Sequence, residues 1–221
     1  MNKKVKTAND ICAELIQRYP VLKSCKAEIL SAYKVIKDSY INGGKLLIAG
    51  NGGSASDSEH IVGELMKSFL FHRAIDETLA EKLEKEYGKE GQKLSEKLEG
   101  ALSAIPLTSM PALTSAFAND VDSTVDFAQK LNGYGNKGDV FFGISTSGNS
   151  KNIISALMVA HAKEIHTILL SGGNGGKCAN LADISICVPE TETFKIQELH
   201  LPVYHAICSM LEADFFEENN R

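Results

Sequence analysis

The sequence predicts an α/β protein, a three-layer αβα sandwich with a mostly parallel five-stranded sheet, plus a helical insertion. Short apolar runs typical of buried strands alternate with longer segments whose apolar residues recur at helical spacing. Such alternation implies parallel strands joined by right-handed crossovers, with helices on both faces of the sheet. Two of the apolar runs end in turns rich in glycine or serine, and one segment is dense in charge without any strand pattern.

Composition and charge narrow the class of protein. A chain of 221 residues is long enough for one domain with a full hydrophobic core. The formal net charge of -5 argues against a nucleic-acid-binding surface. No apolar run reaches transmembrane length and no apolar segment follows the basic start, so we expect neither a membrane span nor secretion. The five cysteines include no C-x-x-C pair, which fits the reducing cytoplasm.

Residues 7–42 are predicted to form the first helical part of the domain. Apolar residues recur there at helical spacing, and Pro20 separates two helices that we expect to pack on the rest of the domain. Gly43 and Gly44 end the second helix. Residues 45–49 then form the first predicted buried strand.

A turn of residues 50–56 joins this strand to the next helix, which we expect to run to about Leu70. The need for a tight turn alone explains two of its three glycines. Backbone N–H groups at the start of a helix also bind anions, so the turn is a candidate ligand site. It lacks the third glycine of the G-x-G-x-x-G fingerprint, and no nucleotide cofactor is expected.

The helix after this turn carries His60 and Glu64 on one face, four residues apart. Side chains of these types are usually solvated or capped. Here they follow a strand end by one to three helical turns, so they could overlook a ligand at the carboxyl ends of the strands. Asp57 and Glu59 are more simply explained as charges that complement the helix dipole.

Residues 71–100 differ in composition from the rest of the chain. Alternating Glu and Lys with leucines at helical spacing predict an amphipathic helix pair, broken near residues 88–91. We interpret it as an insertion, spanning about 71–102, that packs on the domain or on a neighbouring subunit. The alternative is a lid or specificity element.

The predicted sheet resumes at residues 103–108, where Pro106 indicates an edge strand or a strand end. A helix over residues 111–118 follows and leads to Asn119 and Asp120. This polar pair either faces the ligand cleft or simply terminates the helix.

The strongest functional signal is the stretch of residues 139–150. Its strand, 140–144, breaks into a turn with four hydroxyl side chains in six residues, followed by a helix over 151–162. Helix N-termini stabilise phosphate, and the hydroxyl groups add hydrogen-bond donors, so we interpret the turn as an oxyanion site. The alternative is an ordinary N-cap, for which a single hydroxyl suffices.

The last third of the chain adds two strands, 166–170 and 184–188, and a long helix from residue 193 to about 218. Gln197 and His205 share one face of that helix and can address one site. Pro202 between them predicts a kink, because it removes an amide donor. His200 falls on another side and is interpreted as structural, and Cys208 is not favoured as a nucleophile on spacing alone.

Together these patterns resemble the sugar isomerase (SIS) domain family, and within it the isomerases of sedoheptulose 7-phosphate. The resemblance covers most of the chain outside about 71–102. The segments that carry it are Gly50-Asn-Gly-Gly-Ser54, His60-x-x-x-Glu64, Asn119-Asp120, Gly143-Ile-Ser-Thr-Ser-Gly-Asn-Ser150 and Ile196-Gln-Glu-x-His200 followed by His205.

The resemblance implies the SIS fold and an aldose–ketose isomerase that converts sedoheptulose 7-phosphate to D-glycero-D-manno-heptose 7-phosphate through an enediolate. Glu64 would be the general base between C1 and C2, and His205 the acid/base at the oxygens. The residues that would hold the phosphate and the sugar are Asn51, Gly52, Gly53, Ser54, Asn119, Asp120, Ser145, Thr146, Ser147, Ser150 and Gln197.

The resemblance also implies a cofactor and an assembly. Some family members bind zinc in this pocket, and the matching set here is His60, Glu64, Gln197 and His205, which has ligand types that zinc accepts. The expected assembly is a homotetramer with pockets completed at subunit interfaces. A phosphorylated sugar is the expected partner, with neither nucleic acid nor membrane.

Two departures from the family pattern bear on which sugar is bound: the charged insertion, and Phe194 where some members carry an acidic residue. One alternative is a non-catalytic SIS domain that binds a phosphosugar as a signal or binds a protein such as the replication initiator. The presence of both Glu64 and His205 favours the enzyme. Another alternative is an isomerase of a different ketose phosphate.

Overall fold

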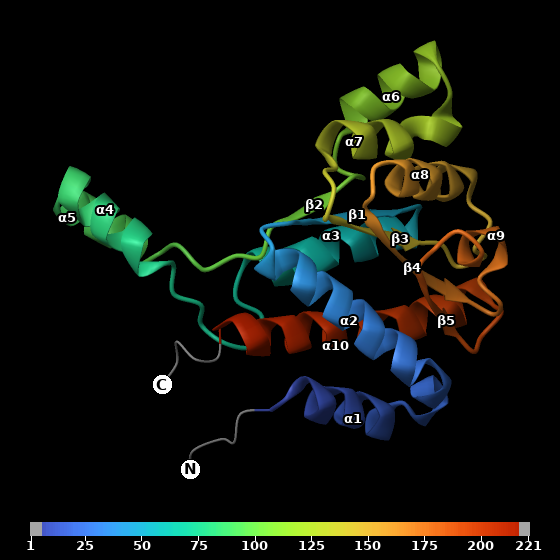
Figure 1. Ribbon diagram of the computed structural model, residues 1–221, viewed down its shortest axis with the longest axis horizontal. Coiled ribbons are helices and arrows are strands. Elements are labelled where there is room, and N and C mark those ends of the chain that lie inside the picture. The colour runs from blue at the N-terminus through green and yellow to red at the C-terminus, as the bar shows by residue number, and fades with distance from the viewer. Residues whose placement is uncertain (1–5, 217–221) are drawn as a thin grey trace.

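The fold is built on one sheet of five parallel strands, seen through the middle of the molecule in Figure 1. The structure is a computed structural model and describes residues 6–216. The strand order is β2-β1-β3-β4-β5. Each predicted strand is present, and all neighbours pair in parallel, as expected. The strands are β1 (Leu46–Gly50), β2 (Ala104–Pro106), β3 (Val140–Ile144), β4 (His166–Gly172) and β5 (Ile184–Val188).

One face of the sheet is covered by helices from both ends of the chain (Figure 1). Strand residues such as Ile48, Phe142 and Leu170 point to this face and join a hydrophobic core with the helices. The elements on this side are α1 (Ala8–Arg18), the 3-10 helix η1 (Pro20–Cys25), α2 (Lys26–Ile41), α3 (Gly53–Met66) and α10 (Thr193–Phe216).

The opposite face carries the helices from the middle of the chain. Alternate strand residues, among them Leu47, Phe141 and Leu169, form a second core with these helices. The strands are therefore buried on both faces, which explains their continuous apolar runs and confirms the three-layer prediction. The elements here are α6 (Pro111–Asp120), η2 (Ser123–Val125), α7 (Asp126–Tyr134), α8 (Lys151–Ala162) and α9 (Gly176–Ala179).

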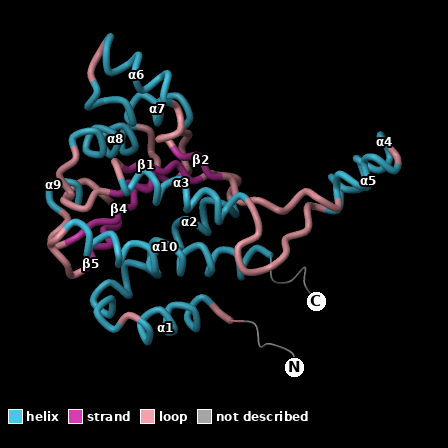
Figure 2. The backbone as a smooth tube through the Cα atoms, turned by 180° about the vertical axis from the view of Figure 1, so that it is seen from behind, coloured by secondary structure: helices cyan, strands magenta, loops and turns pink. Residues whose placement is uncertain are grey.

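The charged insertion forms a helical hairpin of α4 (Glu77–Tyr87) and α5 (Lys89–Ser95). It projects away from the rest of the molecule, as Figure 2 shows from behind. The two helices pack on each other at Gly91, where an added Cβ would lie 1.9 Å from the Leu83 carbonyl oxygen. The hairpin does not pack on the body of its own chain, which corrects one of the two placements expected from the sequence. Packing on a neighbouring subunit stays a prediction.

Three α-helices differ from expectation. Helix α3 ends at Met66 rather than near Leu70, and Lys67 is already extended. Helices α7 and α9 were not predicted. Pro202 lies inside α10, which continues through it. Within residues 6–216, no helix is both long enough and apolar enough to cross a membrane.

Candidate active site

The two turns predicted to bind a ligand lie side by side at the carboxyl end of the sheet. Their strands, β1 and β3, are neighbours in the sheet. The amides of Asn51 and Asn152 exchange two hydrogen bonds, of 3.0 and 2.8 Å, which tie the first turn (residues 50–54) to the start of α8. The second turn (residues 145–150) precedes α8 directly. The structure thus joins both turns in one site.

Gly148 gives the second turn its shape. Its φ is +62°, and an added Cβ would lie 1.8 Å from the carbonyl oxygen of Gly175. The Gly148 carbonyl also accepts a 2.8 Å hydrogen bond from the N–H of Cys178. Only glycine permits this left-handed conformation and this close approach together.

The hydroxyl groups of the second turn are not used to cap α8. Ser150 is the N-cap residue but makes no side-chain capping bond. Its Oγ instead lies 2.9 Å from the Oγ of buried Ser145. Ser147 is exposed and accepts a 3.2 Å hydrogen bond from the N–H of Asn149. The hydroxyl groups therefore do not serve as an ordinary N-cap, although the Ile153 N–H in the first turn of α8 donates to Asn152 Oδ1 at 3.0 Å. The remaining N–H groups at the positive end of α8 are those that an anion would contact.

The first turn begins α3 without a capping side chain as well. Gly52 is the N-cap, with φ +56°. Gln197 of α10 reaches this turn, because a Cβ on Gly53 would lie 2.6 Å from the Gln197 Nε2. Ser54 is 3 % exposed and lies beneath the turn against Gly50. The predicted convergence of Gln197 and the first turn is present, while Ser54 faces inward.

His60, Glu64 and His205 form a cluster between α3 and α10. His60 Nε2 lies 3.0 Å from Glu64 Oε1 and 3.4 Å from His205 Nε2. One ligand atom from each of the three residues lies within 4.8 Å of the others. The prediction that these residues share a site from two distant helices agrees with this geometry.

The surroundings of the cluster shift the pKa values of two groups, His205 and Asp57. Burial and the neighbouring His60 lower the pKa of His205, while Glu64 acts in the opposite direction. The lowered pKa favours the neutral imidazole of His205, which can accept a proton and return it. Burial raises the pKa of Asp57, opposed by its hydrogen bond from Tyr204 and by His60.

An open cavity of about 740 Å³ lies beside the cluster, with His205 in its wall. It is lined mainly by apolar side chains of α1, of residues 69–71 and of α10. The Phe69 ring lies 5.4 Å from the His205 ring, centroid to centroid. The cluster thus borders an apolar hollow on the same side of the sheet as α1.

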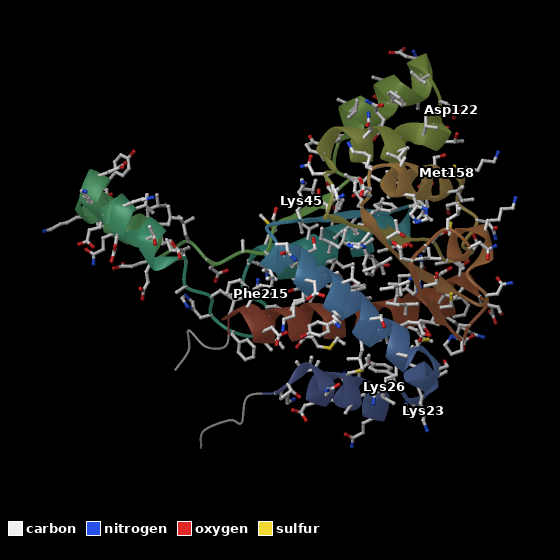
Figure 3. All side chains as sticks on the ribbon, in the orientation of Figure 1. Lys23, Lys26, Lys45, Asp122, Met158 and Phe215 are labelled. Atoms are coloured by element: carbon white, nitrogen blue, oxygen red, sulfur yellow. The ribbon has the colours of Figure 1, made fainter. Side chains whose placement is uncertain are left out.

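Asn119 and Asp120 are not brought to this cluster. They lie in the exposed last turn of α6, where the Asn119 amide donates a 2.8 Å hydrogen bond to Asp120. Asp122, which follows closely, lies beyond α8, on the far side of the sheet from α10 (Figure 3). The expected approach of this pair to the cleft is absent from the single chain, because α6 lies outside α7 rather than over the strand ends (Figure 1).

Three residues of the site are not assigned by the sequence. In the sequence, Tyr204 stands out only because it shares a helix face with Gln197, and Asp57 only as a charge that complements the helix dipole. Nothing in the sequence points to Asn152. Their only sequence signal is spacing: Asp57 precedes His60 by one helical turn, and Tyr204 adjoins His205. Their partners lie on other elements, so spacing alone does not assign their roles.

The cluster has the ligand chemistry of a metal site. Two imidazoles and a carboxylate are ligands that zinc accepts. The second carboxylate oxygen of Glu64, Oε2, is buried and has no hydrogen-bond partner in the described structure, and the nearest cation is the Lys67 ammonium at 3.9 Å. Oε2 therefore has room for a further ligand contact, and the three side chains have donor types that fit a divalent metal ion.

Comparison with known proteins gives a consistent family. The model of the SIS domain family matches residues 12–105 and 99–172. Phosphoheptose isomerase 2 of Campylobacter jejuni is 39 % identical over 196 residues, covering 89 % of this chain and 81 % of the relative. The phosphoheptose isomerase of Aneurinibacillus thermoaerophilus is 39 % identical over 177 residues, covering 80 % of this chain and 76 % of the relative.

Solved structures agree. The phosphoheptose isomerase GmhA of Neisseria gonorrhoeae superposes with a TM-score of 0.71 at 31 % identity, covering 90 % of this chain and 94 % of that one. The phosphoheptose isomerase of Francisella tularensis gives a TM-score of 0.70 at 29 % identity, covering 92 % and 95 %. The chain therefore belongs to the SIS domain family and, within it, to the phosphoheptose isomerases, which are sugar-phosphate isomerases.

Proposed function

We propose that the protein interconverts sedoheptulose 7-phosphate and D-glycero-D-manno-heptose 7-phosphate through an enediolate. One observation carries the proposal: a carboxylate, Glu64, lies among two imidazoles between α3 and α10, and α3 begins at the glycine-rich turn that is tied to the start of α8. Relatives named phosphoheptose isomerase support the choice of sugar.

The second turn would hold the phosphate. Ser150, the N-cap of α8, makes no capping bond, so the first N–H groups of α8 other than that of Ile153 and the positive helix end favour an anion. Ser145, Thr146, Ser147 and Ser150 would add hydroxyl donors. Asn51, Gly52, Gly53, Ser54 and Gln197 would bind the sugar, and Asn119 and Asp120 stay predicted contacts that the single chain does not support.

Proton transfer would be shared by two side chains. Glu64 takes the proton from C1 of the ketose and returns it to C2, so the C1–H bond breaks and a C2–H bond forms. His205, whose lowered pKa favours the neutral imidazole, takes the proton from O1 and gives it to O2, which leaves the aldehyde at C1. Atoms and charges balance without any external oxidant.

A metal ion would be held by His60, Glu64 and His205, with Gln197 as the fourth proposed ligand; the ligand types favour zinc. When bound, zinc supplies Lewis-acid polarisation of the sugar oxygens. No nucleotide is proposed.

We also propose a cytoplasmic homotetramer. All five cysteines are unpaired, which supports a reducing compartment. Leu70 and Leu201, which line the cavity beside His205, are exposed apolar residues that a second subunit would cover. Light scattering of the purified protein tests the subunit number.

The deciding experiment follows proton exchange by NMR in heavy water with sedoheptulose 7-phosphate, with and without zinc. We expect deuterium at C1 and an aldoheptose product. Binding without exchange would instead indicate the regulatory, non-catalytic type, and turnover of hexose phosphates alone would reject the heptose substrate.

The Glu64→Gln variant assigns the base. It should abolish turnover and leave phosphosugar affinity within roughly tenfold, since the proton acceptor is lost and the phosphate turn is untouched. Near wild-type turnover would reject Glu64. As the counterpart, Ser147→Ala with Ser150→Ala should weaken binding, and unchanged affinity would count against the phosphate turn.

A further inference from the structure

Tyr204 connects the catalytic cluster to a second carboxylate. The residue lies on α10 just before His205 and is 1 % exposed. Its hydroxyl donates a 3.2 Å hydrogen bond to Asp57 Oδ1 and lies 3.0 Å from His60 Nδ1. His60 Nε2, on the other side of the ring, lies 3.0 Å from Glu64 Oε1. The four groups form one chain of contacts from Asp57 to Glu64.

This series of four groups makes more contacts than it has donor protons for hydrogen bonds. A carboxylate only accepts hydrogen bonds, a tyrosine hydroxyl has one proton and a neutral imidazole has one. The three contacts are Asp57 with Tyr204, Tyr204 with His60, and His60 with Glu64. Two protons fill two of them, so at the third contact a nitrogen lone pair of the exposed His60 ring faces an oxygen with no proton between them.

Tyr204 is the buried member of these contacts, and its hydroxyl donates a hydrogen bond to Asp57 Oδ1. The Tyr204 oxygen then accepts a hydrogen bond from His60 in the tautomer that carries its proton on Nδ1. The His60 Nε2 lone pair is left facing Glu64 Oε1 and His205 Nε2, at 3.0 and 3.4 Å. Three electron-rich atoms that converge in this way are satisfied together by one divalent cation.

We infer that Tyr204 and Asp57 are positioning residues that hold His60 as its Nδ1–H tautomer, so that its Nε2 is presented to a metal ion together with Glu64 and His205. The inference rests on the metal site of the proposed function. It adds two side chains that touch neither substrate nor metal. Partners of this kind fix the orientation of a ligating histidine and raise its basicity.

A second tyrosine that donates to a carboxylate provides a matched control. Tyr33 also donates its hydroxyl proton to a carboxylate, that of Asp214, at the contact of α2 with the end of α10. Tyr33→Phe therefore removes the same chemical group and the same type of hydrogen bond, but from a tyrosine outside the chain that ends at His60 and Glu64.

The test measures zinc affinity by competition with a chromophoric chelator, without substrate. We expect Tyr204→Phe to weaken zinc binding by roughly 10–100-fold and Tyr33→Phe to leave it unchanged. Asp57→Ala, which keeps the tyrosine and its packing, should weaken it in the same direction. Circular dichroism confirms that each variant is folded.

A second readout reports the tautomer directly. In the zinc-bound protein, the imidazole ¹H–¹⁵N spectrum should show a protected His60 Nδ1–H signal, and Tyr204→Phe should expose that proton to rapid exchange with water. Zinc affinity unchanged in Tyr204→Phe, metal on Nδ1 of His60, or a wild-type protein that binds no zinc would each overturn the inference. Proton exchange into sedoheptulose 7-phosphate is measured separately, so the isomerase proposal can stand or fail independently.

Discussion

Gly148 shows how a single residue constrains the second turn (residues 145–150), which we propose holds the phosphate. Its positive φ, and the 1.8 Å that would separate an added Cβ from the Gly175 oxygen, leave no room for a methyl group. We expect Gly148→Ala to weaken phosphosugar binding by more than about tenfold and to cost more than about 1 kcal/mol of stability, because the turn must shift. Calorimetric titration with sedoheptulose 7-phosphate and urea unfolding measure the two effects.

The control is Gly133→Ala in helix α7, where a Cβ meets no atom within 4 Å. Alanine in a helix is favoured over glycine by up to about 1 kcal/mol, so this variant should be neutral or slightly stabilised. Equal behaviour of the two variants would show that the turn tolerates a side chain.

His200 gives a pH-dependent contribution to stability. It is fully buried, and burial lowers its pKa to about 4, opposed by the Ser171 backbone. The unfolded chain takes up a proton near pH 6.5 but the folded protein does not until about pH 4, so stability is lost as the pH falls between these values. Lowering the pH from 7.5 to 5 should reduce the free energy of unfolding by about 2 kcal/mol through this histidine.

Urea unfolding at both pH values, for the wild-type protein and His200→Gln, isolates this effect, since other titrating groups are shared. The loss between the two pH values should be about 2 kcal/mol smaller in the variant. An equal loss in both proteins would mean that His200 is protonated in the folded state as readily as in the unfolded one.

Among single residues, the sequence predicted those whose partners are near in the chain. His60 and Glu64 stand out because four residues separate them on one helix. Tyr204 and Asp57 do not, since their contact depends on how α10 crosses α3. A tyrosine among apolar residues is expected in the core, and burial alone does not reveal the hydrogen bonds of its hydroxyl.

Between elements, a buried ion pair fixes the end of α3. Arg73 Nε lies 2.8 Å from Glu212 Oε1, and the guanidinium also donates to the carbonyl oxygens of Glu64 and Leu65 at 2.9 and 2.8 Å. Glu212 in turn accepts from the N–H of Phe69 at 2.8 Å. Both charged side chains are fully buried, so the pair holds the last turn of α3, and with it Glu64, against α10.

Glu212→Gln should lower the free energy of unfolding by about 3–5 kcal/mol, because it leaves the Arg73 charge buried without its counterion. We expect a lower kcat as well, since the last turn of α3 carries Glu64. Urea unfolding and steady-state kinetics measure both. Glu192→Gln, which breaks the exposed pair with Lys195, should cost less than about 1 kcal/mol; a similar cost for both variants would contradict a special role for the buried pair.

This ion pair also explains why the sequence misplaced the end of α3. Residues 69–71 leave the helix to give their N–H groups to Glu212, about 140 residues further along the chain. Helix α7 was missed for a related reason. Its Lys130 and Asp126 are buried as an ion pair at 2.9 Å, so charged residues occupy buried positions of this helix and interrupt its apolar pattern.

In the whole molecule, the sheet order explains the position of the site. From β1 the chain passes to β2 on one side and then returns to β3 on the other. Ligands of open α/β sheets bind at such a reversal, and both turns lie there. The sequence predicted parallel strands from their alternation with helices, but strand neighbours depend on long-range packing. The adjacency of the two turns was therefore inferred from their similar composition and not from a predicted strand order.

The projecting hairpin of α4 and α5 exposes apolar residues that no described part of its own chain covers. Its helices bury no side chain, and four large apolar residues are exposed: Leu79 (46 %), Tyr87 (64 %), Leu94 (47 %) and Leu98 (41 %). Its base is tied to the body, because the Gly100 N–H donates to the Arg73 oxygen at 2.9 Å and Ser68 donates to Glu99. Short helices gain most of their stability from packing of an apolar face, and exposed apolar patches mark interaction sites, so we expect a second subunit to cover this arm.

Replacing residues 76–98 by a short glycine-serine linker keeps that base and removes the apolar arm. We expect the shortened protein to remain folded by circular dichroism and to form a smaller assembly by light scattering. Tyr87→Ser with Leu94→Ser should act in the same direction, whereas Glu81→Gln with Glu90→Gln, on the same hairpin, should leave the mass unchanged. If the shortened protein keeps the full subunit number, the hairpin does not join subunits, and its exposed leucines and tyrosine must meet another partner or act as a lid.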